Sequence, residues 1–453
     1  MIRRPPRSTL SSSSAASDVY KRQFRRSDVT MASGRNMGHA HPLLRPEDLI
    51  VLEGLRSKGQ AWIVGGWVRE SISGKGDTDV DIATTLHPDE VQKIFPRSLM
   101  VGAKYGTVCV RLEEEVSGNQ IWEVTTLRSD GSYGDGRRPD DVEFGTDIEG
   151  DLSRRDFTIN AMALEYPYGD DSLIDPFNGR EDLLKGVLAS VGNPSERISE
   201  DGLRILRAFR FMDGGSEGIR EMDDSLSDAI SSSLEMLDMS SNERICSELS
   251  SILSGNRDNE IVSKMEDLGV LEYISGSLLR KSECTLCDDL EVNLALLCRE
   301  FDGNGGQLRK ALRKELMLKN SILDEVCFLH NCREEMMSTG SGYLRRFAAA
   351  LPEQRKIRVV EYMGALGRDT IAFSEALRII GVPRAGLAPL VNGDDLTRET
   401  GLPPGPRLGM LKGWLHRRQV EDDLVTFDEV IQLLGEIDWE DSDPTEWKKM
   451  EWP

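Results

Sequence analysis

The sequence has few cysteines and histidines, and it has no long uninterrupted run of apolar residues. Its 453 residues include only seven cysteines and five histidines. An odd number of cysteines spread thinly over a long chain predicts reduced thiols, as in a cytoplasmic protein, and excludes a small disulfide-stapled scaffold. No stretch approaches the roughly 18 consecutive apolar residues of a membrane helix, because charged residues make up 30% of the chain and occur throughout it. These absences predict a soluble cytoplasmic protein without a membrane partner.

Positive charge is also scarce. The chain has 56 Lys and Arg against 78 Asp and Glu, a formal net charge of −22. This balance argues against a protein that coats nucleic acid nonspecifically, although a local basic groove stays compatible with it. The length predicts two to four packing units, and a hydrophobic content of 39% is sufficient for globular helical domains.

The first 23 residues form a segment of their own, MIRRPPRSTLSSSSAASDVYKRQ. It has a basic start and a Ser/Ala run but lacks the apolar region of a secretory signal peptide. We interpret it as translated sequencing-adapter DNA, with a mitochondrial transit peptide as the alternative, favoured by its arginines and serines. The natural start is then Met31 or Met37, and residues 1–41 are expected to be non-native or disordered.

Two kinds of pattern follow along the chain. From about residue 42 to 191, short β-branched runs alternate with glycines and short helical patterns, which predicts an α/β or α+β domain. The expected strands are Ala61–Val64, Thr78–Ile82, Thr107–Leu112, Ile121–Thr126 and Met162–Tyr166. After Glu196, amphipathic stretches of helical period predominate. They include residues 201–212, 225–253 and 260–273, so a helical remainder is expected.

The densest chemical signal is residues 62–85, WIVGGWVRESISGKGDTDVDIATT. Gly65 and Gly66 let backbone amides at the start of a helix approach a phosphate. Asp79 and Asp81 are separated by one residue in a segment expected to be extended, so their side chains leave the same face about 7 Å apart at the backbone. Such a pair suits two divalent cations. Taken alone, the two glycines could form a tight turn without a ligand, and the two aspartates could be an ordinary solvent-exposed D-x-D.

Two further segments place charges among apolar residues. In RRDFTINAM, Arg154, Arg155 and Asp156 need partners, because unpaired charges in an apolar element are costly; a structural Arg–Asp pair is the alternative. In EDGLRILRAFRF, Asp201 and Arg204 are three apart, so we expect them to share a helix face while Leu203, Leu206 and Phe209 point inward.

The carboxylate of Asp201 accepts hydrogen bonds, and the guanidinium of Arg204 donates them. This pair matches cytosine and adenine, which each carry an amino donor beside a ring-nitrogen acceptor. It repels guanine and uracil, which carry a carbonyl beside an N–H. Arg207 and Arg210 extend the basic stripe toward incoming phosphates. An ordinary surface ion pair has the same spacing, so the hypothesis depends on the motifs upstream.

Taken together, these segments resemble the nucleotidyltransferase superfamily, specifically the bacterial and eukaryotic type of tRNA CCA-adding enzyme and its poly(A) polymerase relatives. Five segments carry the resemblance: GGWVRE followed by DVDIATT, RRDFTINAM, DPFNGREDL, ERISEDGLRILRAFRF and SNERICSEL. A tail segment, PLVNGDDLTRETGLPPGPRLG, resembles the family's C-terminal region. The resemblance runs from about residue 42 to 434 and is thin between about 254 and 388.

The resemblance implies roles for individual residues. Asp79 and Asp81 would bind catalytic Mg²⁺, and Glu123 in IWEVTTLR would complete the metal site or help take the proton from the primer's 3′ hydroxyl. Arg154 or Arg155 would contact the triphosphate, while Asp156 and Asn160 would reach the ribose hydroxyls. The implied nucleotide-binding residues are Gly65, Gly66, Arg69, Arg154, Arg155, Asp156, Asn160, Asp201, Arg204, Arg207 and Arg210.

The resemblance also implies the architecture and the reaction. The expected class is α+β, with a nucleotidyltransferase head of mixed sheet and flanking helices over residues 42–191, then an all-helical neck (192–260), body (261–385) and tail (386–453). The reaction is template-independent addition of CCA to the 3′ end of tRNA from CTP and ATP, releasing pyrophosphate. The enzyme would act as a monomer or homodimer. Candidate tRNA phosphate contacts in the tail are Arg398, Arg407, Lys412, Arg417 and Arg418.

Other functions stay open. A bacterial-type poly(A) polymerase usually carries a basic G-[RK]-R-F segment where this chain has VGAKYGTVCV, and a CC-adding specialist usually has an altered loop where this chain has DGRRPDDVEF. Both comparisons favour full CCA addition over a poly(A) polymerase or a CC- or A-adding specialist. A catalytically inactive RNA-binding scaffold is the alternative of another class. Cys284 and Cys287 lack a second ligand pair at zinc-finger spacing and are expected to be structural thiols.

Overall fold

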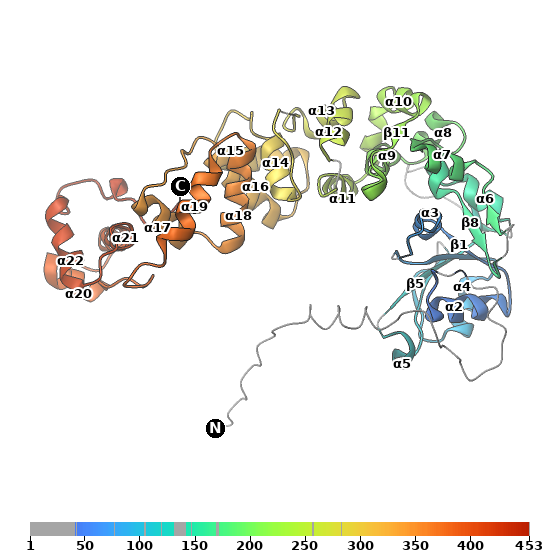
Figure 1. Ribbon diagram of the computed structural model, residues 1–453, viewed down its shortest axis with the longest axis horizontal. Helices are drawn as coiled ribbons and strands as arrows, with labels where there is room; N and C mark the ends of the chain where they lie inside the picture. The colour runs from blue at the N-terminus through green and yellow to red at the C-terminus, as the bar shows by residue number, and fades with distance from the viewer. Residues whose placement is uncertain are drawn as a thin grey trace.

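A computed structural model describes residues 41, 43–76, 78–103, 106–118, 120–130, 142–145, 147–168, 172–255, 258–281 and 283–452. The chain forms an elongated arch, with a sheet-containing head at one end and the C-terminal helices at the other (Figure 1). The segment Met1–Gln23, most of DGRRPDDVEF and the Lys104–Tyr105 part of VGAKYGTVCV lie outside the described residues. Predictions that fall on them are therefore not assessed by the fold.

A seven-stranded mixed sheet forms the centre of the head. Its order is β3-β4-β5-β2-β1-β8-β9, and its pairs are antiparallel except for β2 with β5, which run parallel. The strands are β1 Ala61–Val64, β2 Asp81–Thr84, β3 Leu99–Gly102, β4 Thr107–Val110, β5 Trp122–Thr126, β8 Ala163–Glu165 and β9 Leu173–Ile174. A separate antiparallel pair joins β6 Arg128–Asp130 to β7 Val142–Phe144.

Short helices cover both faces of this sheet. Because side chains alternate across a strand, Ile63 of β1 packs into one apolar cluster, whereas Trp62 and Val64 pack into a second cluster on the opposite face. The first cluster includes residues of α2 and α4, and the second includes Leu152 of α6. The helices of the head are α2 Pro46–Arg56, α3 Gly66–Ile72, α4 Pro88–Ile94, α5 Glu114–Ser117, α6 Ile148–Ser153, η2 Thr158–Asn160 and α7 Gly179–Lys185.

The chain beyond the head is almost entirely helical. Its α-helices are α8 Pro194–Glu200, α9 Arg204–Met212, α10 Asp224–Ser231, α11 Asn242–Ile252, α12 Asp258–Asp267, α13 Val270–Ser275, α14 Leu290–Leu297, α15 Gly305–Glu315, α16 Asn320–Cys332, α17 Ser341–Ala350, α18 Glu353–Ala365, α19 Thr370–Ile380, α20 Gly393–Thr400, α21 Pro406–Glu421 and α22 Phe427–Gln432. Single 3₁₀ turns are η3 Gly215–Glu217, η4 Leu234–Met239, η5 Leu433–Glu436 and η6 Pro444–Glu446. A small parallel pair joins β10 Val187–Leu188, at the end of the predicted head, to β11 Glu221–Met222, a short strand in the neck, where helix alone was expected.

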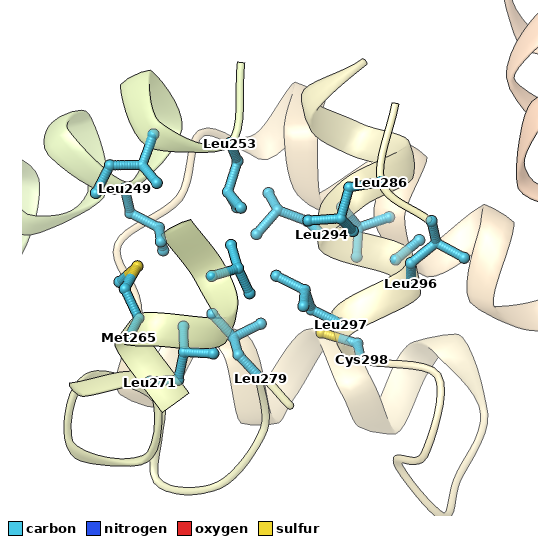
Figure 2. Packing of buried hydrophobic residues seen from close by; sticks show 14 of the residues in the cluster. Leu249, Leu253, Met265, Leu271, Leu279, Leu286, Leu294, Leu296, Leu297 and Cys298 are labelled. Carbon is cyan, nitrogen blue, oxygen red and sulfur yellow. The ribbon is translucent and has the colours of Figure 1, made fainter. Parts of the chain in front are cut away.

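One continuous apolar core joins the end of the head to the middle of the arch. It begins at Phe157 in the head and continues through helices α9 to α19. Leucines of α11, α14 and the segments between them interlock within it, as Figure 2 shows. The C-terminal helices α20 to α22 have a separate core around Leu396 and Leu411. Helix α9 is therefore packed firmly against the helices that follow it.

The α+β class with a mixed sheet is confirmed, but several predicted boundaries are wrong. Strand β2 begins at Asp81 rather than Thr78, because residues 81–84 are the ones that pair with β1; residues 82–84 are buried. The stretch 225–253 is divided into α10, η4 and α11. The stretch 260–273 is divided into α12 and α13 at Gly269, which has a φ of +76° that favours glycine and lies just before α13 begins. Among the described residues, no helix is both long and apolar enough to span a bilayer.

Candidate active site

A cavity of about 540 Å³ opens between the head sheet and helix α9. Its walls contain Asp81, all eleven residues of the predicted nucleotide-binding set, and Phe211. Six arginines and three aspartates line it, an excess of three positive charges in a chain whose net charge is −22. A basic cavity of this kind favours an anionic ligand with several phosphates.

The carboxylates of the site lie on two adjacent parallel strands. Asp81 is the first residue of β2, and the pairing of Ile82 with Val124 places Asp81 beside Glu123 of β5. Asp79 does not share the strand as predicted; it is exposed and lies before β2, because the ladder begins only at Asp81. Burial, followed by the negative charges of Glu123 and Asp79, raises the pKa of Asp81 to about 6, against the opposing effect of Arg155.

The donor chemistry fits a divalent cation. The carboxylates repel one another, and a bound cation would relieve that repulsion while accepting their hard oxygen donors. In the part of the chain that the structure describes, no three His, Cys, Asp or Glu side chains already form a closed metal cluster. Asp79 and Asp81 are therefore candidate ligands of an open site, in which substrate oxygens or water would supply further ligands.

The raised pKa of Asp81 predicts a pH-dependent loss of stability. An aspartate whose pKa is higher in the folded chain keeps its proton longer there, so stability falls as pH rises from about 4 to about 6 and stays reduced above that. Asp81→Asn removes this loss. In EDTA, we expect the melting temperature of the variant to exceed that of the parent by about 2 °C at pH 7 and by nothing at pH 4. An equal difference at both pH values would contradict the prediction.

The Gly-Gly turn faces the same aspartate. Gly65 connects β1 to α3 with φ +74° and ψ −139°, a conformation that favours glycine. A side chain there would begin 3.3 Å from Oδ2 of Asp81 and 3.8 Å from Nη1 of Arg155. The turn is thus open to a ligand that lies between its backbone and these charged groups.

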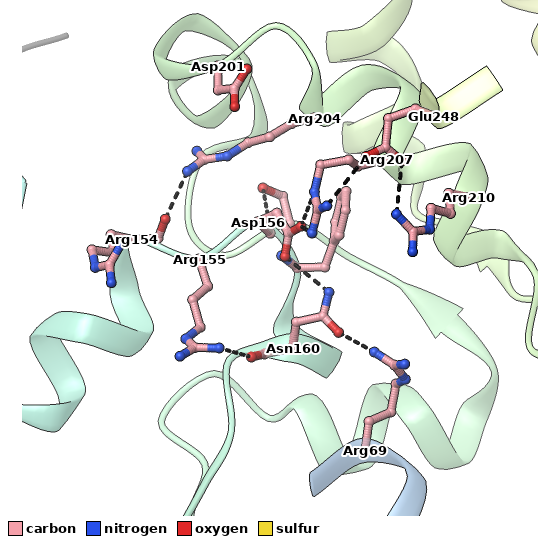
Figure 3. Close-up of polar contacts among 12 residues, drawn as sticks. Arg69, Arg154, Arg155, Asp156, Asn160, Asp201, Arg204, Arg207, Arg210 and Glu248 are labelled. Carbon is pink, nitrogen blue, oxygen red and sulfur yellow. Dashed lines mark hydrogen bonds and ion pairs between the residues drawn. The ribbon is translucent and has the colours of Figure 1, made fainter. Parts of the chain in front are cut away.

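Arg154 and Arg155 share one buried acid. Nη2 of Arg154 lies 2.6 Å from Oδ1 of Asp151, and Nη2 of Arg155 lies 3.2 Å from Oδ2. Both arginines hold the pKa of Asp151 below its usual value despite burial. Arg155 also donates to the carbonyl of Asn160 at 3.3 Å, as Figure 3 shows. The partners that these charges need are therefore local, and both arginines still line the cavity.

Asp156 and Asn160 belong to a polar chain that crosses the cavity wall (Figure 3). Nη1 of Arg69 donates to Oδ1 of Asn160 at 2.5 Å, and Nδ2 of Asn160 donates to Oδ1 of Asp156 at 3.1 Å. Arg207 of α9 completes the chain, with Nη2 2.6 Å from Oδ2 of Asp156. Arg207 and these hydrogen bonds lower the pKa of the buried Asp156 in spite of desolvation. This chain links the head to α9 through its charges.

Near the C-terminal end of helix α9, three arginines surround the aromatic ring of Phe211. The guanidinium carbons of Arg69, Arg207 and Arg210 lie 5.3, 5.1 and 5.9 Å from the centre of the Phe211 ring. Arg210 also lies 3.3 Å from Glu248 of α11. Contact with the ring face stabilises each guanidinium and keeps it at the cavity wall.

Asp201 and Arg204 both line the cavity, but they do not share a helix face as predicted. Asp201 is extended, with φ −150° and ψ 105°, because α8 ends there, and α9 begins only at Arg204. Arg244 of α11 binds Asp201, with Nη2 2.9 Å from Oδ2. Arg204 instead pairs with Glu200 at 2.6 Å and donates to the carbonyl of Arg154 at 2.8 Å. The three residues expected to point inward, Leu203 just before α9 and Leu206 and Phe209 within it, are buried.

Close packing fixes the backbone between these two residues. A side chain at Gly202 would meet the carbonyl oxygen of Met236 at 1.9 Å, so only glycine fits between Asp201 and Leu203. The functional residues that sequence reasoning missed are Phe211, Asp151, Glu200, Arg244 and Glu248. A signal for the last two was present in SNERICSEL, which is the start of α11 and contains both residues.

The tail arginines have partners of their own. Arg407 donates to the carbonyls of Trp439, Glu440 and Ser442. The other predicted tRNA contacts lie on α20 and α21: Arg398 pairs with Asp395, Arg417 with Glu421, and Arg418 with Asp422 and Glu436, while Lys412 is half-buried. Nothing in this geometry brings the five side chains to a single point, so their part in RNA binding stays a prediction.

The mixed sheet, the glycine turn over a strand-borne aspartate and the arginine-lined cavity define the nucleotidyltransferase class. The model of the family described as "Poly A polymerase head domain" matches residues 61–189. A CCA-adding enzyme of Geobacillus kaustophilus is 35% identical over 360 residues, 77% of this chain and 85% of that protein. A CCA-adding enzyme of Geobacillus stearothermophilus is 32% identical over 373 residues, 80% of this chain and 89% of that protein.

The chain therefore belongs to the CCA-adding enzyme family of tRNA nucleotidyltransferases. The crystal structure of the Bacillus stearothermophilus CCA-adding enzyme in complex with CTP matches 87% of this chain and 98% of its own, with a TM-score of 0.70 and 28% identity. A Thermotoga maritima CCA-adding enzyme complexed with tRNA has a TM-score of 0.62 at 19% identity, over 87% of this chain and 97% of its own, and shares the fold. The family resemblance, the enzyme class and the fold class predicted from sequence are confirmed.

Proposed function

We propose that this chain adds CCA to the 3′ end of tRNA from CTP and ATP, by transfer of nucleotidyl groups with release of pyrophosphate. The observation that carries the proposal is the single cavity in which the glycine turn, Asp81, the RRDFTINAM charges and the Asp201–Arg204 pair meet. The CTP complex of the Bacillus stearothermophilus relative supports it. In this proposal the primer's 3′ hydroxyl attacks the α-phosphate in line and pyrophosphate leaves.

Within the cavity, the residues divide by chemistry. The amides at Gly65 and Gly66, with Arg154 and Arg155, bind the triphosphate, since guanidinium groups bind phosphate oxygens in pairs. Asp156 and Asn160 reach the ribose, and Glu123 accepts the proton of the 3′ hydroxyl. The basic groups on α9, Arg207 and Arg210, hold the remaining phosphate charge.

Asp79 and Asp81 would hold Mg²⁺, with Glu123 beside them. When bound, such ions lower the pKa of an attacking hydroxyl and neutralise phosphate charge. The carboxylates contribute the negative charge that keeps cations at this end of the cavity, next to the glycine turn. The partial burial of Asp81 strengthens that attraction relative to bulk water.

The larger organisation is part of the same proposal. We divide the chain into head (42–191), neck (192–260), body (261–385) and tail (386–453), and propose that the tail contacts tRNA through its basic residues. The two shorter cores of the head and the separate core of α20 to α22 support a distinct head and tail. We place the enzyme in the cytoplasm, as a monomer or a homodimer.

The proposal predicts the product of a simple reaction. Protein that starts at Met31 is incubated with Mg²⁺, a tRNA that lacks its 3′ CCA, and labelled CTP and ATP alone and together. We expect CC from CTP alone, CCA from both nucleotides, and no extension beyond CCA, because the proposed reaction ends with the terminal adenosine. Gel electrophoresis at single-nucleotide resolution reads each product.

Other products identify other family members. A long A tail would identify the protein as a poly(A) polymerase. A stop after CC would identify a CC-adding specialist, and a requirement for a primer that ends in CC would identify an A-adding specialist. No incorporation, by a protein that still binds tRNA, would favour an inactive scaffold. A tRNA that already ends in CCA is the control and should not be extended.

A further inference from the structure

A second cavity, of about 350 Å³, adjoins the nucleotide cavity. The two share Arg69, Arg210 and Phe211 as a common wall. The far side is formed by the turn after α3 in the head, by the loop around η3, and by helices α11 and α12. None of the roles proposed above uses this space.

Arg220 is the unusual residue of the second cavity. Its side chain is only 6% exposed, and Nη1 donates to the carbonyls of Phe211 at 2.8 Å and Asp213 at 3.1 Å. Among the described residues, no carboxylate forms an ion pair with its guanidinium. Burial, followed by the charge of Arg69, lowers the pKa of Arg220, against the opposing charges of Glu70, Asp213 and Glu217. A buried guanidinium whose carboxylates act only from a distance is stabilised when an anion binds it directly.

The other cations of the cavity have carboxylate partners. Arg69, Lys75, Arg210 and Arg220 line it together with Glu70 and Asp213. Arg69 pairs with Glu70 at 3.2 Å, Lys75 with Glu217 at 2.9 Å and Arg210 with Glu248 at 3.3 Å. Among the described lining residues, Arg220 is therefore the cation that forms no ion pair.

The rim of the cavity offers further donors. Nζ of Lys75 lies 2.6 Å from Oγ of Ser216 and 2.9 Å from Oε1 of Glu217. The hydroxyl of Ser216 accepts from Lys75 and hydrogen-bonds the Glu217 carboxylate, so Lys75, Ser216 and Glu217 form one polar group at the rim. Lys75 is on the head and Ser216 on the loop after α9, so an anion here would contact both parts of the chain.

We propose that the second cavity is a phosphate-binding site, distinct from the nucleotide cavity and centred on Arg220. Guanidinium groups that converge from different elements match the oxygens of a phosphate. Two sources share this chemistry: free pyrophosphate, and a backbone phosphate of the RNA primer. The choice of these sources rests on the proposed function, whereas the anion site itself does not.

The first arm of the test measures small-anion binding without catalysis. The full chain is titrated with inorganic pyrophosphate in EDTA, which removes any binding that depends on a divalent cation at Asp81. We expect Arg220→Gln to weaken pyrophosphate binding about tenfold, because it removes charge-assisted hydrogen bonds. Arg111→Gln, an exposed arginine at the end of β4, is the matched control and should leave the affinity unchanged.

The second arm measures binding of tRNA that lacks its 3′ CCA, also in EDTA, by the same variants. Loss of pyrophosphate affinity identifies free polyphosphate as the ligand, and loss of tRNA affinity alone identifies the RNA backbone. If Arg220→Gln keeps the parent's melting temperature and matches Arg111→Gln in both arms, the proposal is overturned.

A second variant covers a failure of Arg220→Gln to fold. Lys75 lies at the rim of the cavity, and Lys75→Gln should weaken pyrophosphate binding about threefold, because it removes one positive charge and leaves Glu217 unpaired beside the site. If the pyrophosphate affinity of this variant is unchanged, the proposal is overturned. If the protein binds pyrophosphate in a way that depends on Arg220 but transfers no nucleotide, the proposed function is contradicted and the phosphate site is still supported.

Discussion

Asp81→Asn is expected to abolish nucleotide addition, lowering kcat by at least about a thousandfold, while the protein stays folded. Asp81 is the only carboxylate of the proposed metal site that both begins a sheet strand and lines the nucleotide cavity. Asparagine keeps the shape of the side chain but removes the charge on which cation binding depends. The measurement is single-turnover incorporation of CTP, with circular dichroism and melting temperature to confirm the fold.

The control for this loss is a carboxylate of the same domain outside the cavity. Asp89 is exposed on α4, and Asp89→Asn should retain the parent's rate. Asp79→Asn should also be inactive, because Asp79 contributes to the negative charge around Asp81. Full activity of Asp81→Asn would rule out the assigned chemistry even though the family membership would stand.

The sequence was sufficient to predict this end of the site because its signal is local. The glycine turn, the strand after it and the D-x-D lie within 24 residues, and the order of strand, turn and helix follows from periodicity. What failed was the start of β2, since the ladder with β1 begins at Asp81 and not at Thr78. The register between strands is set by partners elsewhere in the chain, which a single segment does not reveal.

The partners of the cavity residues were harder to predict for the same reason. Arg207 meets Asp156 across 51 residues, and Arg244 meets Asp201 across 43. The sequence indicated that these charges needed partners, but the choice among many acids and arginines depends on how α9 and α11 pack. Phe211 belongs to the motif ERISEDGLRILRAFRF but was given no role there, and its position between two cavities became visible only in the structure.

The second large effect concerns the choice of base. Asp201→Ala is expected to reduce the preference for CTP over UTP by about a hundredfold, mainly through faster incorporation of UTP. The carboxylate of Asp201 accepts hydrogen bonds only, so it attracts the amino group of cytosine or adenine and repels the carbonyl of uracil or guanine. Alanine removes that repulsion. The measurement is kcat/KM for each of the four nucleotides on a tRNA that lacks CCA.

The anchoring of Asp201 sharpens this test. Because Arg244 holds its carboxylate at 2.9 Å from a different helix, Arg244→Gln should shift base preference in the same direction and by less, while it leaves the carboxylate in place. Asp228→Ala, which removes an exposed acid from α10, is the matched control and should preserve the parent's preference. Unchanged discrimination in Asp201→Ala would mean that Asp201 serves only to hold Arg244. Since Arg204 is bound to Glu200 and two carbonyls in this structure, base recognition would then have to reside elsewhere on the cavity wall.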